Sequence, residues 1–332
     1  MSNILFQNAL NRVSQKIPPI WFMRQAGRYH SHYQKLKETY SFAQLCKKPE
    51  LASEVACGPV KEFDFDLAIL FSDILFLLEG LGMSLKFSPG PVFENFITKD
   101  NFRQYSDIEK AIEHMEFQRK AIQITREQLP NSKSLIGFVG GPWTLLRFAI
   151  DKNKQIKEIE DFHFIFLSNV LVPLIKKNIK LQLEAGAEMV MIFDSGVQNI
   201  NSTIFNSKYI FLINEIIKSF PSKLGYYFRG KDLKDVKNLF DSSLGGIGVS
   251  HTVNLKETFS TYKEGFIQGN FDENKMLLDE QKLIKEINLF CDEIKSINDL
   301  SGWICSLGHG VNKFTPEKNI HIFIDTIRKK FS

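Results

Sequence analysis

The chain has 332 residues, of which 43% are hydrophobic, with 42 basic and 38 acidic residues. This length is enough for one large α/β domain or two ordinary ones. The basic and acidic residues are interleaved and form no long basic block, so charge gives no support for nucleic-acid binding. The most apolar stretches, LAILFSDILFLL and FHFIFLSNVLVPLI, are interrupted by Asp73 and Pro173 and are too short to cross a bilayer.

The four cysteines show no C-x-x-C spacing, and the N-terminus does not resemble a signal peptide. We therefore expect reduced thiols in a soluble protein of the cytoplasm.

Eight short apolar runs rich in isoleucine, valine and phenylalanine recur along the chain, and most of them alternate with longer segments of helical character. Near-continuous apolar runs are typical of parallel strands that are covered on both faces. The predicted strands span residues 19–23, 67–71, 135–139, 189–193, 224–228, 245–249, 266–269 and 303–307. The predicted helices span about residues 49–64, 106–128, 155–185, 203–219, 231–240, 255–263, 275–298 and 316–331.

This alternation predicts a single (β/α)8 TIM barrel with parallel strands, and no linker divides residues 1–332. A doubly wound sheet is the rival architecture. However, no G-x-G-x-x-G follows the first strand and no G-x-x-x-x-G-K-[ST] occurs, so the usual nucleotide-binding motifs of that rival are missing.

Polar or glycine-rich stretches follow nearly every predicted strand. In a barrel these residues converge on one mouth, where a ligand would bind. In chain order they are Arg24 and Arg28, Ser72 and Asp73, GGPWT at 140–144, Asp194 and Ser195, Arg229, His251, Asn270, and GHG at 308–310.

Each of these residues also has an ordinary structural interpretation. Arg24 and Arg28 bracket a glycine, so they form either a solvated turn with surface ion pairs or two guanidinium forks on a loop that approaches a ligand. Asp73 lies in an apolar stretch, where a carboxylate is costly unless it caps a helix or opens onto a cavity. Ser195 is also compatible with a helix cap, and His309 with a turn.

Longer motifs carry a resemblance to a known family. The block PPIWFMRQAGRYHSHYQKLKETYSFAQLCKKPELASEV resembles the N-terminal signature of the uroporphyrinogen decarboxylase family, and FDLAILFSDIL resembles its second signature. GFVGGPWTL, IFDS, QGNFD and LGHGVNKFTPEKN resemble further family motifs, in the family order and at about the family spacing. The resemblance covers essentially the whole chain.

The resemblance implies a single (β/α)8 barrel that works as a homodimer, without a metal or an organic cofactor. It implies a carboxy-lyase that removes the carboxyl groups of four acetate side chains of uroporphyrinogen III, giving coproporphyrinogen III in porphyrin and haem biosynthesis. The expected partner is this small polycarboxylate tetrapyrrole, with no nucleic acid and no membrane. Arginine forks suit such a substrate because they match the geometry of carboxylates.

By the same resemblance, Asp73 is the expected centre of the mechanism. Its carboxylate would accept hydrogen bonds from the pyrrole N–H groups and stabilise the cationic ring that forms when a ring carbon is protonated. Arg28 or Arg24, or solvent held by the arginine, would supply the proton. Ser195 and His309 match positions that contact the substrate. The implied substrate-binding loop consists of Arg24, Gln25, Ala26, Gly27 and Arg28.

Several residues depart from the family pattern. Lys37 stands where the family has an arginine, which keeps the charge but loses the bidentate fork. Phe148 replaces a tyrosine near the reacting side chain, so a phenol hydrogen bond worth about 1 kcal/mol is missing. We expect both residues to contact the substrate, and Arg147 is a candidate for the replacement donor. Ser250 and His251 stand in place of the usual Asp-Trp.

Three alternatives from different classes remain. A zinc-dependent corrinoid methyltransferase of the same superfamily would need a set of ligands such as H-x-C, which does not occur in this chain. A divergent tetrapyrrole-binding protein without activity would gain nothing obvious from Asp73. A structural or oligomerisation role would not explain the polar strand ends.

Overall fold

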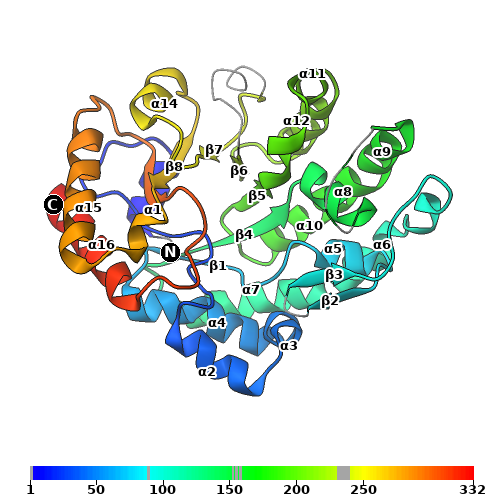
Figure 1. Cartoon of the computed structure of the whole chain (residues 1–332), viewed down its shortest axis with the longest axis horizontal. Coiled ribbons are helices and arrows are strands. Elements are labelled where there is room, and N and C mark those ends of the chain that lie inside the picture. Colours follow the sequence, from blue (N-terminus) through cyan, green and yellow to red (C-terminus); the bar gives the residue numbers. More distant parts are fainter. Residues whose placement is uncertain (1–2, 88–89, 152, 154–155, 157–158, 230–239) are drawn as a thin grey trace.

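A computed structural model describes residues 3–87, 90–151, 153, 156, 159–229 and 240–332. Its main sheet has seven parallel strands in the order β1-β4-β5-β6-β7-β8-β9. The strands curl around a common centre and the helices lie outside them (Figure 1). The strands are β1 (Leu67–Ile69), β4 (Ser134–Gly140), β5 (Val190–Asp194), β6 (Leu224–Phe228), β7 (Gly246–Gly248), β8 (Phe266–Phe271) and β9 (Trp303–Leu307).

An extended segment lies between the first and last strands of this sheet, where the first predicted strand was expected. Ile20 forms an isolated parallel bridge with Cys305 of β9, and the Cys305 N–H donates to the Pro19 carbonyl at 2.9 Å. On the other side, the Asp66 N–H donates to the Ile20 carbonyl at 3.0 Å. The predicted strand 19–23 is therefore a short bridge rather than a full strand, and it fills the eighth position of the barrel.

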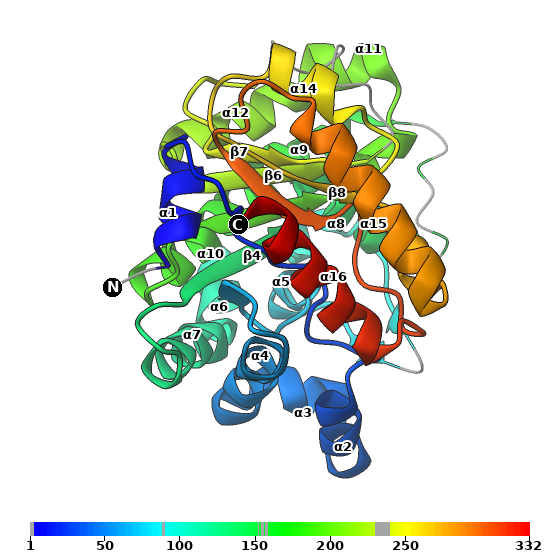
Figure 2. The ribbon, with the colours of Figure 1, turned by 90° about the vertical axis from the view of Figure 1, so that its left-hand side faces the viewer.

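The helices that surround the sheet include α15 and α16, which lie side by side (Figure 2). π-helical turns at Leu167–Leu171 and Phe205–Tyr209 join α9 to α10 and α11 to α12. The helices are α1 (Ile4–Leu10), α2 (Ser31–Thr39), α3 (Phe42–Lys47), α4 (Pro49–Phe63), α5 (Phe76–Gly80), α6 (Ile108–His114), α7 (Glu116–Gln128), α8 (Pro142–Ile150), α9 (Asp161–Phe166), α10 (Val172–Glu184), α11 (Ser202–Ile204), α12 (Ile210–Ser219), α14 (Leu255–Thr261), α15 (Glu280–Lys295) and α16 (Glu317–Phe331).

Most predicted helices are present, with corrected boundaries. The predicted helix 106–128 is two helices, α6 and α7, which are separated at Met115. The predicted helix 231–240 lies outside the described residues except for Phe240. The pattern did not predict α2, α3, α5 or α8, nor the antiparallel pair β2 (Leu85–Phe87) and β3 (Pro91–Phe93).

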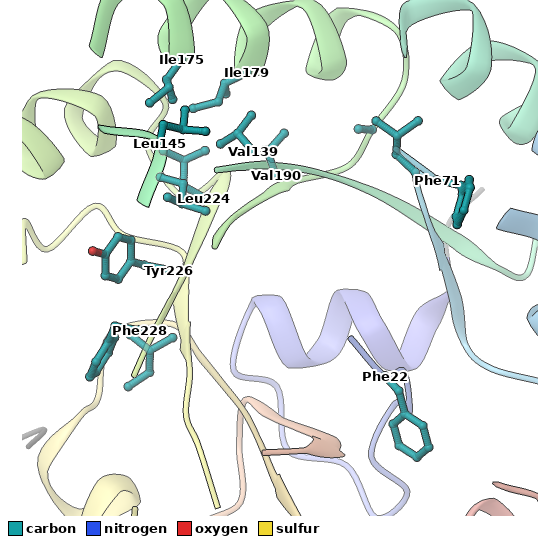
Figure 3. Close-up of a cluster of buried hydrophobic side chains, with 14 of the residues drawn as sticks. Phe22, Phe71, Val139, Leu145, Ile175, Ile179, Val190, Leu224, Tyr226 and Phe228 are labelled. Atoms are coloured by element: carbon teal, nitrogen blue, oxygen red, sulfur yellow. The ribbon is translucent and has the colours of Figure 1, made fainter. Parts of the chain in front are cut away.

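The strands bury side chains on both faces, which explains their nearly continuous apolar sequences. Leu67 and Ile69 of β1 belong to a cluster inside the barrel, whereas Ala68 between them belongs to the larger cluster under the helices. Phe6 and Ala9 of α1 join the inner cluster, so α1 packs against the barrel interior. The outer cluster includes Val139, Val190 and Leu224 from β4, β5 and β6, with Leu145, Ile175 and Ile179 from α8 and α10 (Figure 3).

Candidate active site at the carboxyl ends of the strands

A cavity of about 1220 Å³ opens at the carboxyl ends of the strands. Its walls combine charged side chains with aromatic rings, a composition suited to a large, flat, acidic molecule. Among the residues that line it are Arg24, Ala26, Gly27, Arg28, Lys37, Phe71, Asp73, Phe138, Phe148, Phe193, Ser195, Tyr227, Glu273 and His309. Nine of the ten side chains that the sequence predicted for the site are in this group; Gln25 is not.

Arg24 and Arg28 present two cations to the cavity. Neither guanidinium forms an ion pair or a hydrogen bond within the described residues. Arg24 has a φ of 61°, an unusual left-handed conformation for a residue with a side chain. Although water reaches Arg24 through the cavity, burial by the walls and the neighbouring Arg28 lower its pKa. The two groups are thus held near each other without an anion, as expected of an anion-binding site.

Glycine in the GHG stretch makes room for Arg24. A Cβ atom at Gly310 would lie 2.5 Å from the Cδ atom of Arg24, so only glycine fits beside the bound position of that side chain. Gly27 is also tightly placed, because a Cβ atom there would lie 3.2 Å from the Arg24 carbonyl oxygen. The small residues therefore serve the arginine loop itself.

Gln25 holds the arginine loop against the sheet instead of lining the cavity. Its side chain is fully buried; Oε1 accepts from the Phe22 N–H at 3.2 Å, and Nε2 donates to the Leu67 carbonyl of β1 at 2.9 Å. The Tyr29 hydroxyl donates to the Gln25 carbonyl at 2.7 Å. The expectation that the Gln25 side chain contacts the substrate therefore gives way to a structural role in fixing Arg24 and Arg28.

Asp73 follows β1 and is half-buried in the cavity wall. Its Oδ1 accepts from the Leu75 N–H at 2.9 Å, and no cationic side chain of the described region forms an ion pair with it. Burial raises its pKa, while the Leu75 N–H and the positive charge of Arg24 act in the opposite direction. The helix-cap interpretation is partly right, because this hydrogen bond orders the turn before α5. The second oxygen is left available to a ligand.

His309 is held by a tyrosine that sequence reasoning did not single out. The Tyr227 hydroxyl lies 3.0 Å from Nδ1 of His309 and 3.1 Å from the Gly308 carbonyl, and the two rings are stacked. Burial and the nearby positive charges of Arg24 and Arg229 lower the pKa of His309 to about 4. His309 is therefore neutral near pH 7. Tyr227 was missed because it lies inside the strand LGYYF, which reads as core.

Arg147 does not take the place of the missing phenol at Phe148. Its Nη1 donates to the Gly196 carbonyl at 3.5 Å, and Arg147 is not among the residues that line the cavity, whereas Phe148 is. The suggestion of Arg147 as a replacement donor is therefore not supported by the geometry.

Asp194, at the end of β5, is enclosed by hydrogen-bond donors. Thr144 donates to its Oδ1 from N–H at 3.0 Å and from the hydroxyl at 2.6 Å, and the Tyr226 hydroxyl donates to Oδ2 at 2.8 Å. The Tyr209 hydroxyl donates to Oδ2 as well. Asp194 is completely buried, so it joins β5, β6, α8 and the turn before α12 rather than meeting a ligand.

One group of metal-type ligands occurs among the described residues. Ligand atoms of His251, Asp272 and Glu273 all lie within 4.8 Å of one another. Of these, only Glu273 lines the cavity. The four cysteines are all buried and free.

Comparison with known proteins gives one family. A family model described as Uroporphyrinogen decarboxylase (URO-D) matches residues 1–330. A uroporphyrinogen decarboxylase of Orientia tsutsugamushi (strain Ikeda) is 34% identical over 100% of this chain and 99% of its own length. One of Campylobacter lari is 32% identical over 98% of this chain and 99% of its own length.

Solved structures share the fold at low sequence identity. A methyltransferase from Methanosarcina mazei superposes with a TM-score of 0.81 at 15% identity, over 100% of both chains. A B12-independent methionine synthase from Shewanella sp. W3-18-1 gives a TM-score of 0.55 at 8% identity, over 89% of both chains. These likenesses confirm the barrel fold. Within the described part of the chain, the helices are too short or too polar to span a membrane.

Proposed function

This chain belongs to the uroporphyrinogen decarboxylase family, and we propose that it removes the carboxyl groups of the four acetate side chains of uroporphyrinogen III to give coproporphyrinogen III. This is a step of porphyrin and haem biosynthesis. The observation that carries the proposal is the combination of two unpaired arginines with an unpaired carboxylate in one large cavity. Arg24, Arg28 and Asp73 all line it. A site for an ordinary anion would have no use for Asp73.

The arginines account for binding. A substrate with eight carboxylates releases little water-ordering penalty unless several cations receive it, and guanidinium groups form the strongest hydrogen bonds with carboxylates. Arg24 and Arg28 are available because no protein carboxylate neutralises them within the described residues. Lys37, Ser195 and neutral His309 add polar contacts around the same cavity. Phe71, Phe138 and Phe193 would cover the macrocycle.

Asp73 accounts for the chemistry. Protonating a ring carbon beside an acetate side chain makes the pyrrole cationic, and the electrons of the breaking C–C bond then flow into that ring. A fixed carboxylate that accepts the pyrrole N–H hydrogen bonds stabilises this positive charge as it develops. Burial raises the pKa of Asp73, so the carboxylate gains most from a cationic partner when the ring is protonated.

The family also leads us to propose that residues 1–332 form one domain, that the protein works as a homodimer in the cytoplasm, and that it uses no metal or organic cofactor. None of the steps described above requires such a group. Conversely, the fold alone is shared with methyltransferases and does not choose between these activities.

The test is anaerobic incubation with uroporphyrinogen III, followed by oxidation and chromatographic separation of the porphyrins by their number of carboxyl groups. We expect successive products with seven, six, five and four carboxyl groups. A protein that binds the substrate without producing any of them, at high enzyme concentration and with the correct fold by circular dichroism, would contradict the proposed function.

A further inference from the structure

A pair of titratable side chains connects the cavity wall with the protein surface beside β7 and β8. His251 follows β7 and Glu273 follows β8, with Nδ1 and Oε2 only 3.0 Å apart. The Glu273 side chain is 10% exposed and lines the cavity, whereas the His251 side chain is 28% exposed. The pair therefore has one end in the cavity and the other within reach of water.

The neighbours of the pair place Glu273 close to the centre of the site. Burial raises the pKa of Tyr227 to about 12; Arg229 opposes this rise and the Glu273 carboxylate adds to it. Glu273 and His251 also act on the pKa of His309 in opposite directions, although burial and Arg24 have larger effects. The other charged neighbour is Asp272, whose Oδ1 lies 3.9 Å from Nδ1 of His251.

The proposed reaction consumes protons. When the C–C bond of an acetate breaks, CO₂ leaves and the bonding electrons enter the protonated ring, which generates an exocyclic methylene. The methylene carbon then takes up a proton to become a methyl group, and the ring carbon returns its proton to the group that gave it. Each round therefore consumes one net proton, and a donor in the cavity has to be refilled before the next round.

Resting on the function proposed above, we propose that Glu273 delivers this net proton to the methylene carbon and that His251 reprotonates Glu273 from solvent. Glu273 gives up its carboxyl proton as the new C–H bond forms, and a proton from the His251 imidazolium replaces it. His251 then takes a proton from water. The pair changes its total charge only by the proton that is consumed.

A carboxylic acid suits this role better than the other groups in the cavity. Arginine is a very weak acid, and Asp73 has to remain an anion beneath the ring. His309 is neutral near pH 7 because its pKa is lowered to about 4. The hydrogen bond to His251 also explains how a carboxyl group is tolerated in a cavity for acidic side chains, since the imidazolium balances its charge.

A divalent cation held by His251, Asp272 and Glu273 is the competing explanation of the same geometry. Two observations weigh against it. Nδ1 of His251 is already engaged with Glu273, and Arg24 and Arg229 make the adjoining region positive. If the wild-type enzyme lost activity on exhaustive dialysis against EDTA and regained it with zinc, the cation would replace our proposal.

The decisive experiment compares Glu273→Gln, Glu273→Ala and His251→Asn with the wild type. Glu286→Gln is the matched control, because Glu286 pairs with Lys275 at 2.7 Å and does not line the cavity. We expect Glu273→Gln to lower kcat about 100-fold or more, the usual effect of losing a general acid, with KM changed by less than about threefold. Formate should rescue Glu273→Ala, and kcat of His251→Asn should rise with buffer concentration.

Two results would overturn the inference. One is full turnover by Glu273→Gln; the other is a loss of kcat with no formate rescue, no buffer dependence and an unchanged pH profile, which would mark the pair as purely structural. The wild type separates this failure from that of the proposed function. An inactive wild type removes both, whereas an active wild type with an equally active Glu273→Gln variant removes only the proton-supply role.

Discussion

Two aspartates at strand ends of the same barrel have opposite surroundings. Asp194, after the interior of β5, accepts hydrogen bonds from Thr144, Tyr209 and Tyr226 and is sealed from water. Asp73, after β1, accepts one hydrogen bond from the Leu75 N–H and opens on the cavity. Burial raises the pKa of both carboxyl groups.

The difference separates a structural carboxylate from one that is kept for a ligand. Every oxygen of Asp194 is already used by the protein, so the residue contributes to stability and has no capacity left for chemistry. Asp73 is desolvated without compensating partners, which costs stability and is typical of functional sites. Partners rather than position in the sequence distinguish the two.

The largest effect on folding is expected at Asp194. Asp194→Ala leaves the buried hydroxyls of Thr144, Tyr209 and Tyr226 without their acceptor, and each such loss costs about 1–3 kcal/mol. We therefore expect the free energy of unfolding to fall by at least about 3 kcal/mol. Urea denaturation followed by circular dichroism measures this change.

The comparison would break if Asp73→Ala destabilised the protein as much as Asp194→Ala. Because burial raises the pKa of Asp73, its charged form is disfavoured in the fold, and its removal should leave stability unchanged or slightly higher at pH 7.

The next largest effect concerns the cations that accompany Asp73. Arg24→Met removes a guanidinium that makes no hydrogen bond within the described residues, so the fold should persist. A charge-assisted hydrogen bond to a substrate carboxylate is worth about 1.5–3 kcal/mol, which corresponds to a rise of about 10- to 100-fold in KM. Arg103→Met, at an exposed arginine outside the cavity, is the control. Equal KM values for the two variants would remove Arg24 from the binding site.

A smaller effect is expected from His309 on the pH dependence of stability. Its pKa is lowered from 6.5 to about 4, so the folded state favours neutral imidazole. This contribution to stability is complete above pH 6.5 and is lost as the pH falls towards 4. We expect His309→Gln to lose less unfolding free energy than the wild type between pH 7 and pH 4.5. An identical loss in both proteins would show that His309 does not titrate in this way.

The smallest effect should come from Phe148, which faces the same cavity. Phe148→Tyr restores a phenol, and one neutral hydrogen bond of about 1 kcal/mol corresponds to a rise of about fivefold in kcat/KM. Steady-state kinetics under anaerobic conditions would measure it. A decrease would indicate that the cavity has adapted to the phenylalanine, with Tyr227 already supplying the phenol.

The strand positions were predictable because parallel strands with two covered faces have an unmistakable apolar sequence, and the polar residues after them mark the mouth. Arg24, Asp73, Ser195 and His309 were found in this way. The closure of the barrel was less predictable: the segment around Ile20 is apolar like a strand, yet it forms a single bridge to Cys305.

Side-chain partners account for what the sequence did not reveal. Gln25 looks like a polar residue of a binding loop, but its amide satisfies backbone groups of Phe22 and Leu67. Glu273 and Tyr227 looked like a loop residue and a core residue, because contacts between distant strand ends decide whether a side chain reaches the cavity. Such contacts join residues far apart in the chain and leave no local pattern.

The central claim, that the Asp73 carboxylate stabilises the cationic ring, is tested most directly by measuring turnover of uroporphyrinogen III with Asp73→Asn. We predict a fall in kcat of about 100- to 1000-fold, as for the loss of other electrostatic stabilisers, in a variant that unfolds at the wild-type temperature and still binds substrate. An Asp73→Asn enzyme with a kcat within about twofold of the wild type would contradict the account.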